Sequence, residues 1–418
     1  MNVMIGTARR RRDTGPVFRL SDLGLQGDTA ARLAEMRAAG PLVQTRMPMI
    51  GRFRVTTTYA ATQEVMKGQA RFVLERRNAT GRGGAAGFSW WMPRNVRLMA
   101  SNMLARDDPE HRRLRRLVDK AFARQGVKGM ADDIGARAER LLDAMPVRGE
   151  VDLVEAYARR LPSEVIADML GVPDAARDRF MARAGRLTAS TSRLGMMRAV
   201  AGIGSFVRDF RAIVAEVRRT ERPGLISELI AVEEAGDQLS EDELVAMVFL
   251  LLFAGMETTT NLISGSVTAL ADNPGQTQWL LADPEARIER AVEELCRHVS
   301  AVAGTKPRFV AEDTQVAGVA LARGEMVMAL PVAANHDPAV FDAPHELRLD
   351  RFPNPHLSFS AGNHFCLGMQ LARVEVQQAL LRLHARFPGL RVPPPRGRDY
   401  LGRAGHRGFA RLMVRPDG

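Results

Sequence analysis

The sequence predicts a mainly α-helical protein with a small β part, and three observations support this fold class. Apolar residues make up 46% of the 418 residues and aromatic residues only 6%, so the interior should be aliphatic and rich in methionine. Apolar side chains recur at spacings of three and four over long stretches, which is the period of an amphipathic helix. Short strand-like segments occur near the start and late in the chain.

The expected elements follow from these patterns in chain order. Residues 52–57 have the character of a strand, and short strands are expected between residues 313 and 331, where Gly318 and Gly324 mark turns. Residues 338–355 are punctuated by proline and should be irregular, and a terminal β segment is expected after residues 393–395. Helices are expected over residues 109–124, 127–144, 153–170, 205–219, 241–270 and 367–385.

The domain organisation is expected to be simple. No internal repeat and no long Gly/Ser linker divides the sequence, so residues 17–418 should form a single domain behind a flexible, arginine-rich tail at residues 1–16. The tail has no secretory signal pattern. The longest apolar run, residues 244–255, is shorter than the roughly 20 residues of a membrane span. We therefore expect a cytoplasmic protein with no membrane span.

Charge and cysteine content exclude several classes of protein. The formal net charge is +11, but the arginines are spread along the chain, which argues against a nucleic-acid-binding stripe. The chain has two cysteines, Cys296 and Cys366, and neither lies in a CxxC pair. A disulfide framework and a zinc site are therefore not expected.

Cys366 lies where a glycine-containing loop meets a predicted helix. Unpaired amide groups and the helix dipole favour an anion there, so a thiolate is expected, although a lone cysteine is more often a small buried apolar residue. Gly362 and Gly368 remove side chains on both flanks, as a flat macrocycle against the backbone would require. Phe359 is placed to shield the sulfur, and His364 to reach a carboxylate at the edge of such a ring.

These five residues, with Leu371, Ala372 and Arg373, resemble the haem-binding signature of the cytochrome P450 family. The resemblance extends over residues 107–373. It implies the cytochrome P450 fold, with haem b (iron protoporphyrin IX) enclosed in a single domain. It also implies that Cys366 is the axial ligand of the haem iron and that the protein is a monooxygenase.

A second motif interrupts an apolar helix with a carboxylate and a hydroxyl, Glu257 and Thr258. By themselves these residues fit an exposed helix face equally well. The resemblance implies that they line the distal side of the haem, where Thr258 hydrogen-bonds oxygen and Glu257 relays protons from solvent. Ala254, beside the haem, and Gly255 would leave room for oxygen.

Two further sets of residues support the resemblance. Glu294 and Arg297 share one helix face, and the resemblance implies that Arg351 joins them in a buried triad beneath the cysteine loop, with Cys296 as a core thiol. A solvent-exposed charged face is the alternative for His111 and Arg115. The resemblance implies instead that the haem carboxylates are bound by His111, Arg115, Arg308 and His364. The family's usual proline after the ExxR arginine is replaced by Ser300–Ala301, and Arg308 lies farther along than usual.

The predicted reaction is hydroxylation or epoxidation of a hydrophobic small molecule with O2. Electrons should come from a separate, acidic ferredoxin and its reductase, docking on a basic surface at Arg112, Arg113, Arg116, Lys120 and Arg124, and the protein should be a monomer. The candidate substrate-pocket residues are Phe88, Trp90, Trp91, Leu250, Phe253, Ala254 and Val302. Two alternatives stay open: peroxide-driven oxygenation, and a non-catalytic haem-thiolate protein that binds ligands or senses gas. The pair Glu257–Thr258 argues against both.

Overall fold

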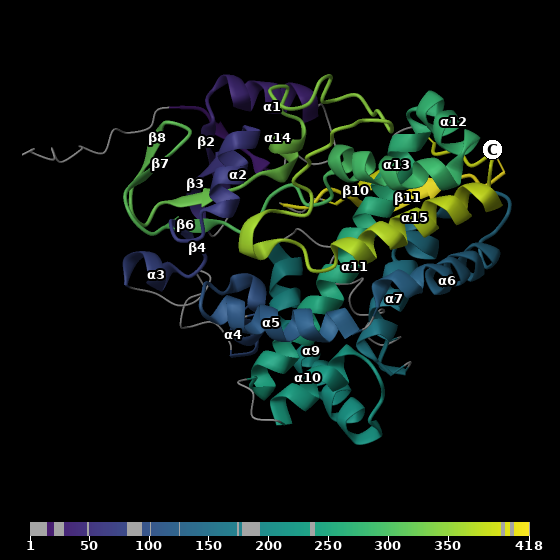
Figure 1. The fold of residues 1–418 in the computed structure, drawn as a ribbon, viewed down its shortest axis with the longest axis horizontal. Helices are drawn as coiled ribbons and strands as arrows, with labels where there is room; N and C mark the ends of the chain where they lie inside the picture. The colour runs from purple at the N-terminus through teal and green to yellow at the C-terminus, as the bar shows by residue number, and fades with distance from the viewer. Residues whose placement is uncertain are drawn as a thin grey trace, which may run out of the picture.

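The computed structural model describes residues 15–20, 29–47, 50–81, 94–100, 102–124, 126–173, 175–177, 193–234, 239–393, 398–401 and 405–417. Over these residues the predicted class is confirmed, since helices make up most of the molecule and the short strands lie partly at one end and partly among the helices at the other (Figure 1). The arginines at residues 9–12 fall outside the described residues.

The helices make up most of the molecule. Their bounds are α1 Thr29–Ala38, α2 Tyr59–Lys67, α3 Arg76–Thr80, α4 Arg94–Ala100, α5 Glu110–Arg124, α6 Ala131–Asp143, α7 Arg160–Leu170, α9 Arg193–Thr220, α10 Leu225–Glu234, α11 Glu241–Ala271, α12 Pro274–Ala282, α13 Pro284–Val299, α14 Pro331–Asn335 and α15 Met369–Arg386. Single turns precede some of them, including a π-helical turn at Val154–Ala158 and 3-10 turns at Val127–Met130 and Gly362–His364.

The strands form three sheets. Their bounds are β1 Val17–Phe18, β2 Leu42–Met47, β3 Gly51–Thr56, β4 Phe72–Val73, β5 Val151–Asp152, β6 Arg308–Val310, β7 Thr314–Val316, β8 Val319–Leu321, β9 Met326–Met328, β10 Arg398–Tyr400 and β11 Phe409–Val414. The largest sheet has the order β1-β2-β3-β9-β6-β4, so strands from the first and second halves of the chain pair in it. The other two sheets are β10-β11-β5 and the hairpin β7-β8.

Helix α11 runs through the centre of the helical part (Figure 1). It begins with a capping box, in which the Ser240 hydroxyl accepts a hydrogen bond from the amide of Glu243 and the Glu243 carboxylate accepts one from the amide of Ser240. It packs against α7, α13 and α15. By length and composition α11 could also cross a membrane, but 67% of its most apolar window is buried inside the protein, as expected of a core helix.

Most predicted helices lie within a few residues of the observed bounds. The main difference is α9, which begins at Arg193, twelve residues before the predicted start at residue 205. Three glycines, Gly195, Gly202 and Gly204, lower the helix propensity of this added segment and obscure its apolar period. The stretch 153–170 is divided into the π-helical turn and α7 rather than being one α-helix.

Candidate functional site

The cysteine loop is held by backbone contacts on both sides of Cys366. The amide of Cys366 donates to the carbonyl of Phe359 at 2.9 Å, and the guanidinium of Arg115 donates to the carbonyl of Phe365 at 2.7 Å. Burial raises the pKa of the Cys366 thiol, while the backbone amide of Gly368 and the nearby Arg115 and Arg373 oppose that shift. The prediction that the loop alone favours a thiolate is therefore wrong in direction. Coordination to a metal ion would deprotonate this thiol.

The two glycines of the loop are required for different reasons. Gly362 has a positive φ of 74°, and a Cβ there would lie 2.9 Å from the carbonyl oxygen of Met66 at the end of α2. The close neighbour of Gly362 is thus a helix, which corrects the expectation that a macrocycle demands this glycine. A Cβ at Gly368 would meet nothing within 4 Å. The backbone is therefore accessible at Gly368, as a flat ring lying against it would require.

A group of basic side chains lies beside the loop and is here called the ring-edge cluster: His111, Arg308, His364 and Lys306. The rings of His111 and His364 are 4.1 Å apart between centroids, and His111 is only 2% exposed. Arg308 is 3% exposed and donates to the carbonyls of Val65 and Met66 at 3.3 and 3.4 Å. Among the residues that the structure describes, Nε2 of His111 and Nε of Arg308 are buried and have no hydrogen-bond partner.

The electrostatics of the ring-edge cluster indicate an anionic ligand. The pKa of His364 is lowered to about 3 by burial and then by His111, Arg308 and Lys306. Burial also lowers the pKa of Arg308 to about 10 and that of Lys306 to about 8. A bound anion would reverse these shifts, since an opposite charge favours the charged form of a base. The two propionates of haem b fit this requirement.

The four predicted haem-carboxylate ligands are thus brought to one side of the loop, although Arg115 also bonds elsewhere. Its Nε donates to Asp119 at 2.8 Å, in addition to its bond to the Phe365 carbonyl. Lys306 was not predicted from the sequence. The signal for it was a cation two residues before Arg308, at the entrance to the same strand β6.

Glu257 and Thr258 lie where helix α11 changes from buried to partly exposed. Ala254 is exposed although Leu251 and Leu252 before it are buried, so the helix faces open space at this residue. The hydroxyl of Thr258 donates to the carbonyl of Ala254 at 2.7 Å. Glu257 is half-buried rather than fully buried. A Cβ at Gly255 would lie 2.9 Å from Ile166, so this glycine serves packing against α7 and not room for oxygen.

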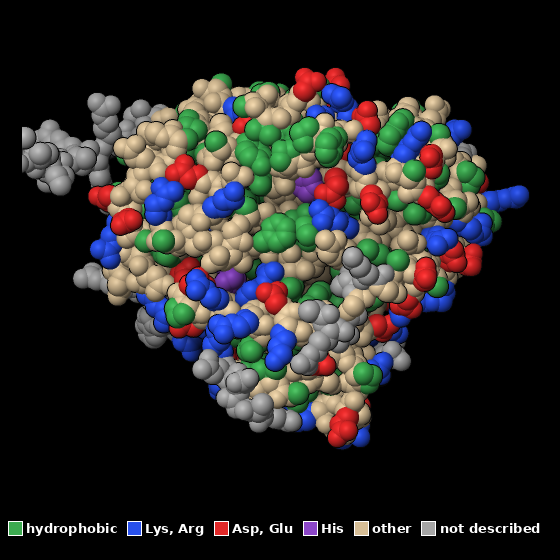
Figure 2. Space-filling model, viewed as in Figure 1, with side chains coloured by type: hydrophobic (Ala, Val, Ile, Leu, Met, Phe, Trp, Pro, Cys, Tyr) green, Lys and Arg blue, Asp and Glu red, His purple; other side chains and the backbone are tan. Residues whose placement is uncertain are grey.

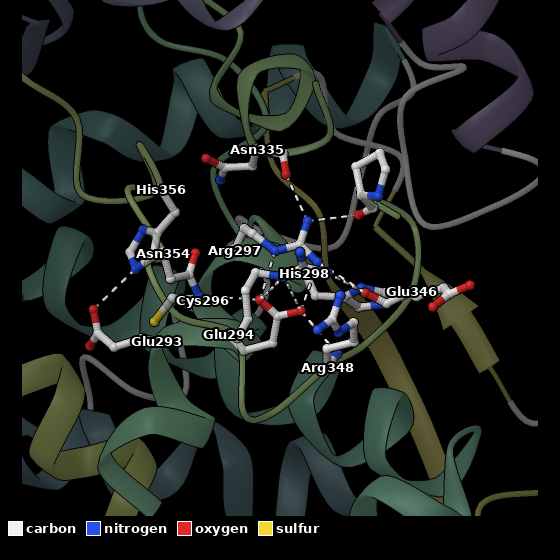
Figure 3. Close-up of polar contacts among 12 residues, drawn as sticks. Glu293, Glu294, Cys296, Arg297, His298, Asn335, Glu346, Arg348, Asn354 and His356 are labelled. Atoms are coloured by element: carbon white, nitrogen blue, oxygen red, sulfur yellow. Dashed lines mark hydrogen bonds and ion pairs between the residues drawn. The ribbon is translucent and has the colours of Figure 1, made fainter. Parts of the chain in front are cut away.

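The predicted triad forms a fully paired network, and Figure 3 shows its Glu294 and Arg297 side chains pointing toward each other. Arg297 binds the Glu294 carboxylate through two hydrogen bonds of 2.7 and 2.8 Å, and Nε of Arg351 lies 3.1 Å from both carboxylate oxygens. The three side chains are 0%, 0% and 6% exposed. The remaining donors of Arg297 reach the backbone carbonyls of Asn335, Pro344 and Glu346.

The neighbouring carboxylate, Glu293, faces the cysteine loop instead. It accepts two hydrogen bonds from Arg373 at 2.6 and 2.8 Å and lies 3.2 Å from Nε2 of His356 (Figure 3 shows the latter contact). Burial alone would raise the pKa of Glu293, but His356 and Arg373 outweigh it and the pKa falls to about 2. Sequence reasoning missed this cluster because Glu293 was treated only as part of the helix before the ExxR motif.

The predicted substrate-pocket residues are only partly tested. Phe88, Trp90 and Trp91 lie outside the described residues. Leu250 is buried in the main core, and Phe253 packs its ring 4.5 Å from that of Phe249. Val302 forms an isolated bridge with His406.

The predicted basic surface is less positive than its sequence suggested. Lys and Arg side chains gather over the region of α5 (Figure 2). However, Arg112 pairs with Asp108 at 2.9 Å and Arg113 pairs with Glu243. Arg116 and Lys120 are exposed.

Comparison with known proteins agrees with this geometry. The family model for cytochrome P450 matches residues 197–283 and 287–394. Mycinamicin IV hydroxylase/epoxidase of Micromonospora griseorubida is 37% identical over 371 residues, which cover 88% of this chain and 90% of the relative. Vitamin D(3) 25-hydroxylase of Pseudonocardia autotrophica is 41% identical over 290 residues, covering 69% and 71%.

Solved structures give the same result. The polyketide synthase cytochrome P450 PksS of Bacillus subtilis superposes with a TM-score of 0.82 at 31% identity, covering 93% of this chain and 96% of that one. The tirandamycin C-bound P450 monooxygenase TamI superposes with a TM-score of 0.85 at 28% identity, covering 96% and 99%. The chain therefore belongs to the cytochrome P450 family, and it is a haem b-binding monooxygenase.

Proposed function

We propose that this protein inserts one oxygen atom of O2 into a hydrophobic small molecule at a haem whose iron is held by Cys366. The observation that carries the assignment is the ring-edge cluster. Its basic groups, of which His111 and Arg308 are buried, lie beside the loop of Cys366 and have the charge needed to bind two haem propionates. When bound, the haem supplies the iron centre at which O2 is activated and the substrate oxidised.

Cys366 is favoured over the other cysteine by its position. Cys296 lies inside α13, is 1% exposed, and has a pKa raised by burial. Cys366 is half-buried in a loop beside the ring-edge cluster and lies two residues before Gly368, where the backbone is accessible. Only Cys366 therefore combines access to a ligand with nearby cations.

Thr258 and Glu257 are proposed to bind and relay protons on the side of the haem that faces away from Cys366. The Thr258 hydroxyl already donates to the carbonyl of Ala254, so its lone pairs are directed away from that carbonyl and can accept a proton donor such as water. Glu257, the residue before Thr258, is half-buried and can exchange protons with solvent. Together they hold a proton close to the exposed face of Ala254 while the surrounding apolar helix limits bulk water.

The substrate is proposed to be apolar, and the electron donor a separate acidic ferredoxin in the cytoplasm. Relatives named as a mycinamicin IV hydroxylase/epoxidase, a vitamin D(3) 25-hydroxylase and a steroid C26-monooxygenase support the substrate class. Exposed Arg116 and Lys120 on α5 support the donor, because an acidic partner is attracted to such a surface.

The ligand assignment is tested with the two cysteines as a matched pair. Cys366→Ala should abolish the carbon monoxide absorption band characteristic of thiolate-ligated ferrous haem. Cys296→Ala should retain that band, because it removes only a core sulfur. Persistence of the band in Cys366→Ala would overturn the assignment.

The proton role is tested on α11. Thr258→Ala should keep haem and substrate binding but lower the oxygenated product formed per electron pair by about tenfold. The remaining electron pairs should appear as hydrogen peroxide. Thr260→Ala is the control, because Thr260 makes the same hydrogen bond to the residue four before it, 2.8 Å to Met256, but lies in the core. Equal product yields for Thr258→Ala and the unaltered protein would remove Thr258 from the mechanism.

A further inference from the structure

A charged pair connects helix α13 to the loop that carries the proposed iron ligand. Glu293 of α13 and Arg373 in the first turn of α15 are joined by two hydrogen bonds of 2.6 and 2.8 Å. The Arg373 guanidinium carbon also lies 5.2 Å from the centre of the Phe359 ring. The Phe359 carbonyl in turn accepts the amide hydrogen of Cys366 at 2.9 Å. One continuous set of contacts therefore runs from Glu293 to the backbone of Cys366.

A second neighbour of the Phe359 ring is also held by Glu293. His356 lies 3.2 Å from the Glu293 carboxylate, and its ring is 5.7 Å from that of Phe359 between centroids. Glu293 thus orients both side chains that flank Phe359. Its side chain is 30% exposed and that of Arg373 is 24% exposed, so water screens the pair only partly.

The two residues carry opposite charges next to the cysteine loop. The Arg373 guanidinium lies over the Phe359 ring, and the Phe359 carbonyl is hydrogen-bonded to the amide of Cys366, so this positive charge is close to the proposed ligand. Glu293 is held ionised by its two partners and compensates that positive charge. The loop therefore lies next to a nearly neutral pair instead of an isolated cation.

We propose that Glu293 and Arg373 are positioning residues that set the reduction potential of the iron through Phe359 and the Cys366 thiolate. The inference rests on the proposed ligand Cys366. An isolated positive charge near the thiolate stabilises the ferrous state, which carries one positive charge less, and an isolated negative charge stabilises the ferric state. Removing either partner leaves the other uncompensated. The two removals therefore change the potential in opposite directions.

The experiment compares reduction potentials of the haem-loaded protein. Glu293→Gln should raise the potential and Arg373→Met should lower it, each by a roughly threefold to tenfold change in the equilibrium constant for one-electron reduction. The double variant should return close to the unaltered protein, since both charges are then absent. Arg373→Lys should shift the potential less than Arg373→Met, because it keeps the charge.

A second arginine on the same helix provides the matched control. Arg386, in the last turn of α15, also pairs with a carboxylate, Asp143 at 3.3 Å, and also stacks on a phenylalanine, Phe387 at 5.0 Å. Thirteen residues of helix, about 20 Å, separate it from Arg373. Arg386→Met should leave the potential unchanged.

The outcomes separate this inference from the ligand assignment. Opposite shifts that cancel in the double variant support the pair, because a purely structural disturbance would move both single variants in the same direction. Shifts of the same sign, or no shift, with the thiolate carbon monoxide band intact would overturn the role of the pair and leave Cys366 as ligand. A band that survives in Cys366→Ser would instead overturn the ligand assignment.

Discussion

Two polar clusters lie beside the cysteine loop, and they differ in how their charges are satisfied. In the Glu294 network one carboxylate receives both arginines, and the remaining donors of Arg297 end on backbone carbonyls. In the ring-edge cluster the neighbours that shift the pKa of His364 are basic, and burial lowers the pKa values of Arg308 and Lys306. A complete network stabilises the fold by itself, whereas accumulated positive charge indicates a site for an anionic ligand.

A buried nitrogen without a hydrogen-bond partner does not by itself distinguish a ligand site from a structural cluster. Arg407 also has a buried Nε with no hydrogen-bond partner in the described part of the chain, yet it lies against the backbone of α13 and donates to the carbonyl of Val299 at 2.8 Å. What marks the ring-edge cluster is the gathering of several basic groups around His364. The comparison thus predicts that the same kind of substitution has different consequences in the two clusters.

The largest effect is expected from breaking the complete network. Glu294→Ala leaves two arginines, 0% and 6% exposed, without their carboxylate, and loss of one partner of a buried pair costs about 3–5 kcal/mol of the free energy of unfolding. The measurement is urea-induced unfolding of the haem-loaded protein. Glu289→Ala, an exposed position on the same helix, should stay within about 0.5 kcal/mol of the unaltered protein. Equal midpoints for the two variants would contradict a structural role for the network.

A smaller effect is expected from acid, because histidines beside the network are held neutral. The pKa of His298 is lowered to about 3 by burial and then by Arg297, Arg407 and His345, with Arg351 adding to the effect. The pKa of His336, whose ring is 6.0 Å away, is lowered well below its usual value by burial, Arg407 and His298.

The direction of this pH dependence follows from proton binding. A histidine with a lowered pKa binds fewer protons in the folded state than in the unfolded state. Its contribution to stability is therefore complete above about pH 6.5, the usual pKa of histidine, and is lost as the pH falls toward 3. Because His298 is partly exposed, we expect a loss on the order of 1–2 kcal/mol between pH 6.5 and 4.5. Unfolding titrations of His298→Leu should have a flatter pH dependence, and parallel curves would contradict this account.

Much of the fold and of the site could be predicted from sequence. The apolar pattern defined α5, α11 and α15 within two residues, because α5 and α15 bury one face and α11 is apolar and buried over most of its length. The motifs around Cys366 and Glu294 are so specific that a resemblance to the family suffices to locate these two residues.

What sequence could not predict depends on long-range packing. Gly362 is required because the end of α2, nearly 300 residues earlier, lies too close for a side chain. Gly255 is required because Ile166 on α7 lies equally close. The thiol pKa was predicted with the wrong sign because local amide donors were visible in the sequence and burial was not. Glu293 and Lys306 were missed for the same reason, since their importance comes from partners brought near by the fold.

The smallest effect, and the sharpest test of the comparison, comes from two buried arginines that resemble each other. Arg308 and Arg407 are 3% and 6% exposed, and burial lowers the pKa of each to about 10. Replacing a poorly paired buried cation by an apolar side chain costs little, so Arg308→Met and Arg407→Met should each change the unfolding free energy of the haem-free protein by less than about 1 kcal/mol. Only Arg308→Met should weaken haem retention, by about tenfold, because only Arg308 belongs to the ring-edge cluster that is proposed to bind the propionates. The rate of haem transfer to excess apomyoglobin measures this retention. Equal rates for the two variants would mean that the gathering of basic groups does not mark the haem site, and that the difference between the two clusters is only one of packing.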